Sequence, residues 1–280
     1  MHVSAFAKIN LSLRVMGTRP DGYHELRTVF QSIALHDTLT IRLAPGRFAL
    51  TCDVPGCPAD RTNLVWRAAE LVWRAAGRRG VPRDMSIHLT KRIPMRAGLG
   101  GGSSDAAAAI RALGRRWGVD DVRQRAIAAA LGADVPFFFE GGTVLGLERG
   151  DLLFPLVDHP PAWVVIVVPR FGISTSDAFS WVDLRSERQS GVRRLENDLQ
   201  AVVADRHPEI ARIVRGLRRS GASLAAMSGS GSAVFGLFPA RRSATRAAAS
   251  AGRAQGMGEL GAVLVTRTLD RAAYRRLAAK

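Results

Sequence analysis

A glycine-rich segment, Gly98–Ser104, constrains the fold of this chain more than any other part of the sequence. It lies between a predicted strand, Met85–Thr90, and an alanine-rich segment, Asp105–Leu113, that is predicted to be helical. Glycines let the backbone N–H groups of a loop approach an anion closely, and the start of a helix adds positive potential. The segment is therefore predicted to bind phosphate groups. A flexible linker is the alternative, but a linker is not expected between a strand and a capped helix.

The loop matches neither of the common nucleotide-binding motifs. It lacks the lysine that completes a Walker loop, and Ser103 occupies the third glycine position of the G-x-G-x-x-G pattern. Ser103 or Ser104 is expected to cap the helix that follows. The sequence therefore indicates a third kind of phosphate loop.

The second half of the chain contains predicted elements in the order β-α-β-β-α-β, which is the order of ferredoxin-like domains. These elements are Trp163–Val168, Glu196–Arg219, Ser223–Met227, Ala233–Phe238, Arg241–Ala254 and Ala262–Thr268. A chain of 280 residues has the length of two ordinary domains. We predict domains at residues 1–157 and 158–280, joined near the connector Asp158–Pro161.

The first half opens with a predicted strand, Val3–Val15, and a cluster of turn residues at Gly17–Gly22. A second strand is predicted at Thr38–Leu43, and a helix at Leu64–Ala75 with Asn63 as its cap. The first half is therefore predicted to contain both strands and helices.

Two polar side chains in the first strand indicate a site. Lys8 and Asn10 are separated by one residue, so both project to the same face of the strand. A strand face that meets solvent would show the same pattern, and the sequence alone does not separate the two interpretations.

Asp134 is an acid within the strongly apolar segment Leu131–Phe139. Either it caps a helix that Val135 and Pro136 open, or it is a desolvated catalytic carboxylate. The two roles can coexist.

Two further features are weaker signals. The turn Ser228–Ser232 lies between two predicted strands, where such a composition is often only a hairpin turn. Cys52 and Cys57 have no second cysteine pair and no nearby histidine, so two reduced thiols are expected rather than a zinc site.

The net charge of +16 requires a choice between a nucleic-acid-binding protein and a basic enzyme with acidic substrates. In Arg206–Gly221 the arginines alternate with apolar residues at helical spacing, as on a solvated helix face. Aromatic residues make up 6% of the chain and do not interleave with arginines, so no nucleic-acid partner is expected.

The longest aliphatic run, Val164–Val168, has the length of a strand, and the N-terminus lacks signal-peptide features. We expect no membrane association and a cytoplasmic location.

Six blocks of the sequence, in the same order, resemble the GHMP kinases. They are Ala7–Leu11, Arg19–Leu26, Asn63–Val65, Pro94–Ala107, Gly132–Pro136 and Met227–Gly231. The resemblance implies an α+β fold with two domains, an N-terminal domain like that of ribosomal protein S5 and a ferredoxin-like C-terminal domain. It also implies an ATP-dependent kinase that phosphorylates an alcohol.

The same resemblance implies the residues of the site. ATP, accompanied by Mg²⁺, would be bound by Asn63, Leu64, Lys91, Gly98, Gly100, Gly101, Gly102, Ser103 and Ser104. Asp134 would accept or orient the proton of the substrate hydroxyl, and Lys8 would stabilise the carboxylate and the developing phosphoryl charge. No residue is predicted as a dedicated metal ligand, because no carboxylate cluster is present to form a cage for Mg²⁺.

The block Arg19–Leu26 is specific to one branch of the GHMP kinases, whose acceptor is a small alcohol linked to cytidine diphosphate. The acceptor site it implies consists of Asn10, Tyr23, His24, Thr175, Phe179, Ser228 and Gly229. Without the resemblance, the aromatic residues would be interpreted as core residues and His24 as a turn histidine.

This chain departs from the family pattern at few positions. Arg96 and Ala97 replace frequent glycines, and Ser228 and Ser230 replace common threonines. A kinase for mevalonate, homoserine or a sugar is the nearest alternative, and a basic RNA-binding protein is the alternative from another class. The oligomeric state is not predicted.

Overall fold

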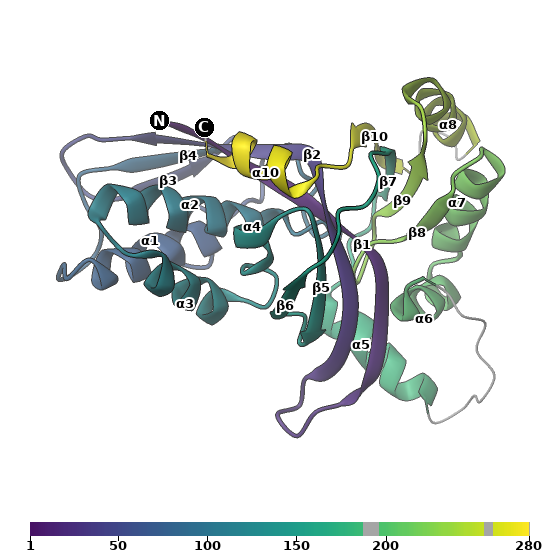
Figure 1. The fold of residues 1–280 in the computed structure, drawn as a ribbon, viewed down its shortest axis with the longest axis horizontal. Helices are drawn as coiled ribbons and strands as arrows, with labels where there is room; N and C mark the ends of the chain where they lie inside the picture. Colours follow the sequence, from purple (N-terminus) through teal and green to yellow (C-terminus); the bar gives the residue numbers. More distant parts are fainter. Residues whose placement is uncertain (187–195, 255–259, 280) are drawn as a thin grey trace.

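The computed structural model describes residues 1–186, 196–254 and 260–279. These residues form two mostly antiparallel sheets with helices packed on them. Strands β1 and β2 belong to the first sheet and extend toward the second (Figure 1). No helix in this described part of the chain is long and apolar enough to cross a membrane.

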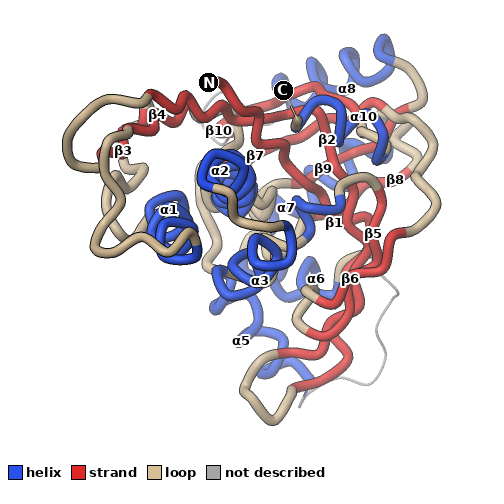
Figure 2. The backbone as a smooth tube through the Cα atoms, turned by 60° about the vertical axis from the view of Figure 1, so that its left-hand side comes forward, coloured by secondary structure: helices blue, strands red, loops and turns tan. Residues whose placement is uncertain are grey.

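The first sheet has six strands. Its strand order is β3-β4-β2-β5-β6, and β1 also pairs with β2. The strands are β1 (His2–Thr18), β2 (His24–Arg42), β3 (Ala49–Cys52), β4 (Ser86–Thr90), β5 (Thr143–Glu148) and β6 (Leu152–Pro155). Helices α1, α2 and α3 lie together against one face of this sheet (Figure 2). Their bounds are Leu64–Ala75, Gly101–Trp117 and Asp121–Leu131, and the short α4 (Phe137–Glu140) follows them.

The second sheet has four strands in the order β10-β7-β9-β8, with every neighbouring pair antiparallel. These strands are β7 (Trp163–Pro169), β8 (Leu224–Met227), β9 (Val234–Phe238) and β10 (Leu260–Arg267). The helices are α5 (Thr175–Ser186), α6 (Asp198–Arg206), α7 (Pro208–Arg219) and α8 (Arg241–Ala254). Numbered within the sheet, the strand order is 4-1-3-2, so the predicted ferredoxin-like arrangement is confirmed.

Local sequence explains several of these elements. The Asn63 side chain accepts a hydrogen bond from Val65 N and caps α1, as predicted. On α7, the apolar residues at helical spacing are buried, while the arginines between them are exposed. The predicted solvated arginine face is therefore confirmed.

The start of α2 corrects one expectation. Neither Ser103 nor Ser104 caps this helix, because it begins at Gly101 and its cap is Gly100, which has a φ of 70° and no side chain to donate or accept. The predicted helix Glu196–Arg219 is likewise two helices, separated at His207, where Pro208 starts the second.

A cluster of apolar side chains joins the two sheets. Ala7 and Ile9 of β1, together with Leu99 from the glycine-rich segment, pack against Ile166 and Phe235 of the second sheet. After β10 the chain returns to the first sheet through α10 (Arg271–Ala278), which packs on β1 (Figure 1). The domain boundary at 157/158 stays a prediction.

Candidate active site

The glycine-rich loop and the Ser/Gly turn are docked on each other, although 130 residues separate them in the chain. Ser228 Oγ donates to Gly98 O at 2.9 Å, and Ala233 N donates to Ala97 O at 3.2 Å. A Cβ on Gly98 would lie 2.0 Å from the carbonyl oxygen of Ser228, so only glycine fits there. The turn at Ser228–Ser232 is therefore more than a hairpin connection, because it forms one wall of the loop.

Lys8 and Asn10 face inward on β1 and are almost fully buried. Lys8 Nζ donates to Asn10 Oδ1 at 2.8 Å, and Asn10 Nδ2 donates to Thr28 Oγ1 at 2.8 Å. The solvent-facing interpretation of this pair is excluded. Thr28 holds the amide so that its oxygen is directed at the lysine, and the ammonium is thereby fixed in position.

Asp134 supplies the negative partner of Lys8. Its Oδ2 lies 3.4 Å from Lys8 Nζ, and its side chain is 37% exposed. The short helix α4 has Pro136 at its cap position and no side-chain cap, so Asp134 does not cap it. The carboxylate is left beside a buried ammonium and open to solvent, where a ligand hydroxyl can reach it.

The aliphatic part of Lys8 passes over the glycine-rich loop. Lys8 N donates to Leu99 O at 3.0 Å. A Cβ on Gly100 would lie 3.0 Å from Lys8 Cγ and 2.8 Å from Phe138 Cζ. Gly100 is therefore needed both for its left-handed φ of 70° and for the close approach of these two side chains.

Lys91 lies behind the loop in a buried group of charges. Its Nζ donates to Asp105 Oδ2 at 2.6 Å and also to Asp37. Asp37 Oδ1 also accepts from Arg92 N at 2.5 Å and from Ile93 N at 2.8 Å. Burial lowers the pKa of Lys91, but attraction to Asp105 and Asp37 outweighs it, so the pKa is raised overall.

Burial and repulsion from Asp37 raise the pKa of Asp105 to about 7, against the attraction of Lys91. Asp105 Oδ1 is buried and has no hydrogen-bond partner among the described residues. A buried carboxyl oxygen without a hydrogen-bond donor stabilises the charged form poorly, which agrees in direction with the raised pKa.

The predicted ATP-binding residues meet around the same loop. A Cβ on Gly102 would lie 3.9 Å from Leu64 Cδ1, and one on Gly101 would lie 3.5 Å from Lys91 Nζ. Asn63 caps the helix that starts at Leu64. The two serines differ, since Ser104 Oγ is buried and donates to Phe6 O at 2.7 Å, while Ser103 is only partly buried.

The predicted acceptor residues lie on β1, on β2 and the turn before it, on the Ser/Gly turn and on the first half of α5. Thr175 Oγ1 lies 3.2 Å from Ser230 Oγ, which connects α5 to the turn. The His24 and Phe179 rings are stacked, with 4.7 Å between their centroids. Tyr23 is 57% exposed, with the guanidinium of Arg149 over its ring. It is not a core aromatic residue.

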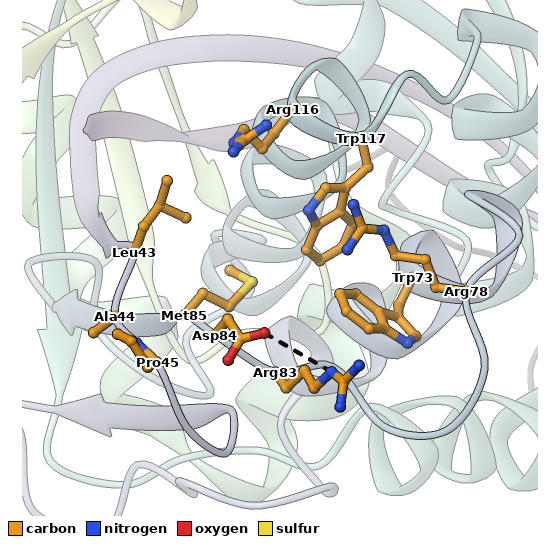
Figure 3. Close-up of a pocket in the computed structure, with 10 residues that line it drawn as sticks. All are labelled: Leu43, Ala44, Pro45, Trp73, Arg78, Arg83, Asp84, Met85, Arg116 and Trp117. Atoms are coloured by element: carbon orange, nitrogen blue, oxygen red, sulfur yellow. Dashed lines mark ion pairs between the residues drawn. The ribbon is translucent and has the colours of Figure 1, made fainter.

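A hollow of about 340 Å³ lies at another part of the molecule (Figure 3). Trp73, Trp117 and Arg78 line one side of it, and Leu43, Ala44 and Pro45 line the other. The ion pair between Arg83 and Asp84 lies between these two sides. It contains none of the predicted site residues.

Several residues of the site have no local sequence pattern that marks them. Thr28, Asp37 and Phe138 reach it only through the register of β2 and the turn before α4. Asp105 directly follows the glycine-rich loop in the sequence, which places it near the site. Its ion pair with Lys91 was not predicted. Asp183, which contacts His24, was also missed.

Comparisons with known families agree with this geometry. Residues 63–142 match the profile described as "GHMP kinases N terminal domain", and residues 182–256 match "GHMP kinases C terminal". The first match contains the glycine-rich loop and Asp134.

Curated relatives match over most of their length. A 4-diphosphocytidyl-2-C-methyl-D-erythritol kinase of Solibacter usitatus is 45% identical over 88% of this chain and 84% of its own. The protein of the same name from Pelotomaculum thermopropionicum is 42% identical, over 95% of this chain and 97% of its own. A crystal structure of a 4-(cytidine 5'-diphospho)-2C-methyl-D-erythritol kinase superposes with a TM-score of 0.78 at 36% identity. It covers 96% of this chain and 99% of that one.

Proposed function

The chain belongs to the GHMP kinase family and is an ATP-dependent kinase, and we propose that it phosphorylates the 2-hydroxyl of 4-diphosphocytidyl-2-C-methyl-D-erythritol. This is the acceptor named in its curated relatives. We place its phosphorylation in the non-mevalonate route to isoprenoid precursors.

The observation that supports the proposal most strongly is the position of Lys8 between Asn10 and Asp134, directly over Gly100. A buried ammonium, a solvent-accessible carboxylate and a backbone phosphate loop meet within one small volume. In-line phosphoryl transfer requires these parts, because positioning and charge stabilisation supply most of the rate.

The chemical step follows from this arrangement. The acceptor hydroxyl oxygen forms a bond to the γ-phosphorus, the bond from that phosphorus to the β–γ bridging oxygen breaks, and ADP leaves. Asp134 takes or orients the hydroxyl proton, since its Oδ2 is beside Lys8 and its side chain remains accessible. Lys8 stabilises the negative charge that develops on the transferred group.

Mg²⁺ would enter with ATP. Among the described residues, no group of three or more histidine, cysteine, aspartate or glutamate side chains can hold a metal ion. The cation would be held mainly by phosphate oxygens and water, and it would neutralise phosphate charge when it is bound. Asp134, partly exposed, is the acidic side chain that lies nearest to Lys8.

The acceptor would lie between β2 and α5, against Tyr23, His24 and Phe179, with its alcohol directed at Asp134. Stacking on aromatic faces binds a planar base with little discrimination, worth ~1–3 kcal/mol per base. Hydrogen bonds to the edge of the base would supply the choice of cytosine.

The test is to incubate the protein with ATP, Mg²⁺ and one alcohol at a time, and to measure ADP release. The alcohols are 4-diphosphocytidyl-2-C-methyl-D-erythritol, mevalonate, homoserine and a hexose. Turnover with the first alone is expected. Turnover only with one of the others would refute the proposed acceptor, and ADP release with none of them would refute transfer to any of these alcohols.

A further inference from the structure

Helix α5 fixes the side chain of His24 from two directions. The Phe179 ring stacks on the imidazole at 4.7 Å with an interplanar angle of 23°. One helical turn further along, Asp183 Oδ1 lies 2.8 Å from His24 Nε2. The His24 side chain is only 12% exposed. Both the plane of the ring and the environment of one of its nitrogens are therefore set before a ligand binds.

The contact with Asp183 also determines which nitrogen carries the proton. A carboxylate accepts hydrogen bonds and donates none, so Nε2 must be the donor in this pair. In the neutral imidazole the other nitrogen, Nδ1, is then an acceptor. Within the described residues, Nδ1 of His24 has no hydrogen-bond partner of its own. A single acceptor is left for a ligand.

Cytosine and uracil differ at the position that such an acceptor would test. Cytosine carries a 4-amino group, which donates, whereas uracil carries a 4-oxo group, which accepts. An acceptor on the protein pairs with the amino group and faces the oxo group with two acceptors in contact. The second arrangement leaves both groups unsatisfied when water is excluded.

We propose that Asp183 is a positioning residue that holds His24 in the tautomer with a free Nδ1 acceptor, so that the site selects cytosine over uracil. The inference rests on the proposed function, which places the base of the acceptor against His24. Asp183 does not touch the reacting atoms, and it acts only by setting which nitrogen of His24 carries the proton.

Asp183→Asn is the informative substitution, because an asparagine amide can either donate or accept. With the amide as donor, Nε2 becomes the acceptor and Nδ1–H becomes a donor, which suits the uracil oxo group. The preference for one tautomer is then lost while the size of the side chain is kept. Asp183→Glu keeps a carboxylate and is expected to retain the wild-type preference in part.

The experiment measures binding of cytidine 5'-diphosphate and uridine 5'-diphosphate to the full chain by calorimetry. A non-hydrolysable ATP analogue occupies the glycine-rich loop, so that neither probe binds there. The variants are Asp183→Asn, Asp183→Glu and, as a matched control, Asp177→Asn, an exposed acid on the first turn of the same helix.

We expect wild type and Asp177→Asn to prefer the cytidine probe equally, and Asp183→Asn to lower that preference about tenfold, the effect of one base-edge hydrogen bond. An unchanged ratio in Asp183→Asn would overturn the inference, as would equal weakening of both probes, which indicates a purely structural role. Turnover of the cytidine substrate by wild type is measured in parallel. If wild type lacks turnover, the proposed function fails. If wild type has turnover and Asp183→Asn keeps the ratio, only the role of Asp183 fails.

Discussion

The Nζ atom of Lys8 lies 3.4 Å from Oδ2 of Asp134, and the two side chains come from the first strand and from the turn before α4. The lysine is almost completely buried, whereas the carboxylate is partly exposed. A buried ammonium requires a negative partner, and a carboxylate that handles a proton benefits from a fixed positive neighbour. The two residues are therefore expected to act as one unit.

Asp134→Ala is expected to lower kcat by roughly a hundredfold or more, as for a lost general base, while the affinity for ATP changes little. Single-turnover kinetics and ATP calorimetry measure the two quantities. Asp134→Asn is the matched variant, since it keeps the side-chain volume and removes only the basic oxygen. Wild-type turnover by either variant would exclude the assigned role.

Gly102→Val is expected to weaken ATP binding at least tenfold and to leave the fold intact, because a side chain there would occupy the phosphate site. Gly102 is the loop glycine with the most room, since its Cβ would meet only Leu64 at 3.9 Å. A Cβ on Gly98 or Gly100 would instead collide with protein atoms. Gly216→Val, at a helical glycine with no neighbour within 4 Å, is the control. Undiminished ATP binding by folded Gly102→Val would contradict the assignment of the loop.

Asp105→Asn is expected to change how stability depends on pH. Since the pKa of Asp105 is raised to about 7, the folded protein binds more protons than the unfolded chain between about pH 4 and 7. The contribution of this group to stability is therefore largest at low pH and is lost as the pH rises toward 7. Relative to Asp105→Asn, the wild type should lose roughly 1–3 kcal/mol between pH 5 and pH 8. Urea unfolding at several pH values measures this, and parallel profiles for both proteins would be evidence against a raised pKa.

Tyr23→Ala and Phe179→Ala are each expected to raise KM for the cytidine diphosphate substrate about tenfold, the loss of one stacking contact, with a smaller effect on KM for ATP. Phe179 now stacks on His24, so its removal also frees the imidazole. Steady-state kinetics with each substrate varied separately distinguish the two effects. An equal rise in both KM values would argue against a specific acceptor site.

Tyr274→Phe is expected to lower the free energy of unfolding by about 1–3 kcal/mol, because the Phe138 carbonyl would lose its partner in a buried site. Tyr274 is 3% exposed, and its hydroxyl donates to that carbonyl at 2.6 Å. Burial raises the pKa of the hydroxyl to about 12, so it keeps its proton throughout the usual pH range. Denaturant unfolding measures the change, and an unaltered midpoint would show that the hydrogen bond contributes little.

Local patterns in the sequence predicted the elements whose burial they control directly. The amphipathic spacing of α7 was correct for this reason. The cap at Asn63 was correct because its side chain bonds to a backbone N–H two residues further on. The ferredoxin-like order was confirmed by the strand order of the second sheet. The first half of β2, from His24 to Asp37, was missed because it is interrupted by buried polar residues. Thr28 and Asp37 contact residues of the site, whereas Gln31 and Ser32 bond to the chain at Leu269 and Gly142. A strand that lines a site lacks the simple alternation of a half-buried strand.

The site was predictable where a local sequence pattern marks its residues. Glycines followed by a helix indicate an anion site, and Lys8 with Asn10 indicates a shared face. The partners that orient these residues were not predictable. Thr28, Asp37 and Asp183 are ordinary polar residues until the register of β2 and the docking of α5 bring them into contact. Long-range packing decides those contacts, and no local pattern records it.

The return of α10 to the first sheet has a consequence for synthesis on the ribosome. Tyr274 supports the backbone of Phe138, which packs beside Gly100 and Lys8, so the surroundings of Asp134 are incomplete until α10 has been made. At ~5–20 residues per second, the strands and helices of the second sheet take several seconds to emerge after the first sheet has formed. During that interval Phe6 and the neighbouring apolar surface of β1 lack the side chains of Leu269, Tyr274 and Ala278 that bury them in the complete fold. Catalytic competence should then appear late, when the helix closes over that surface.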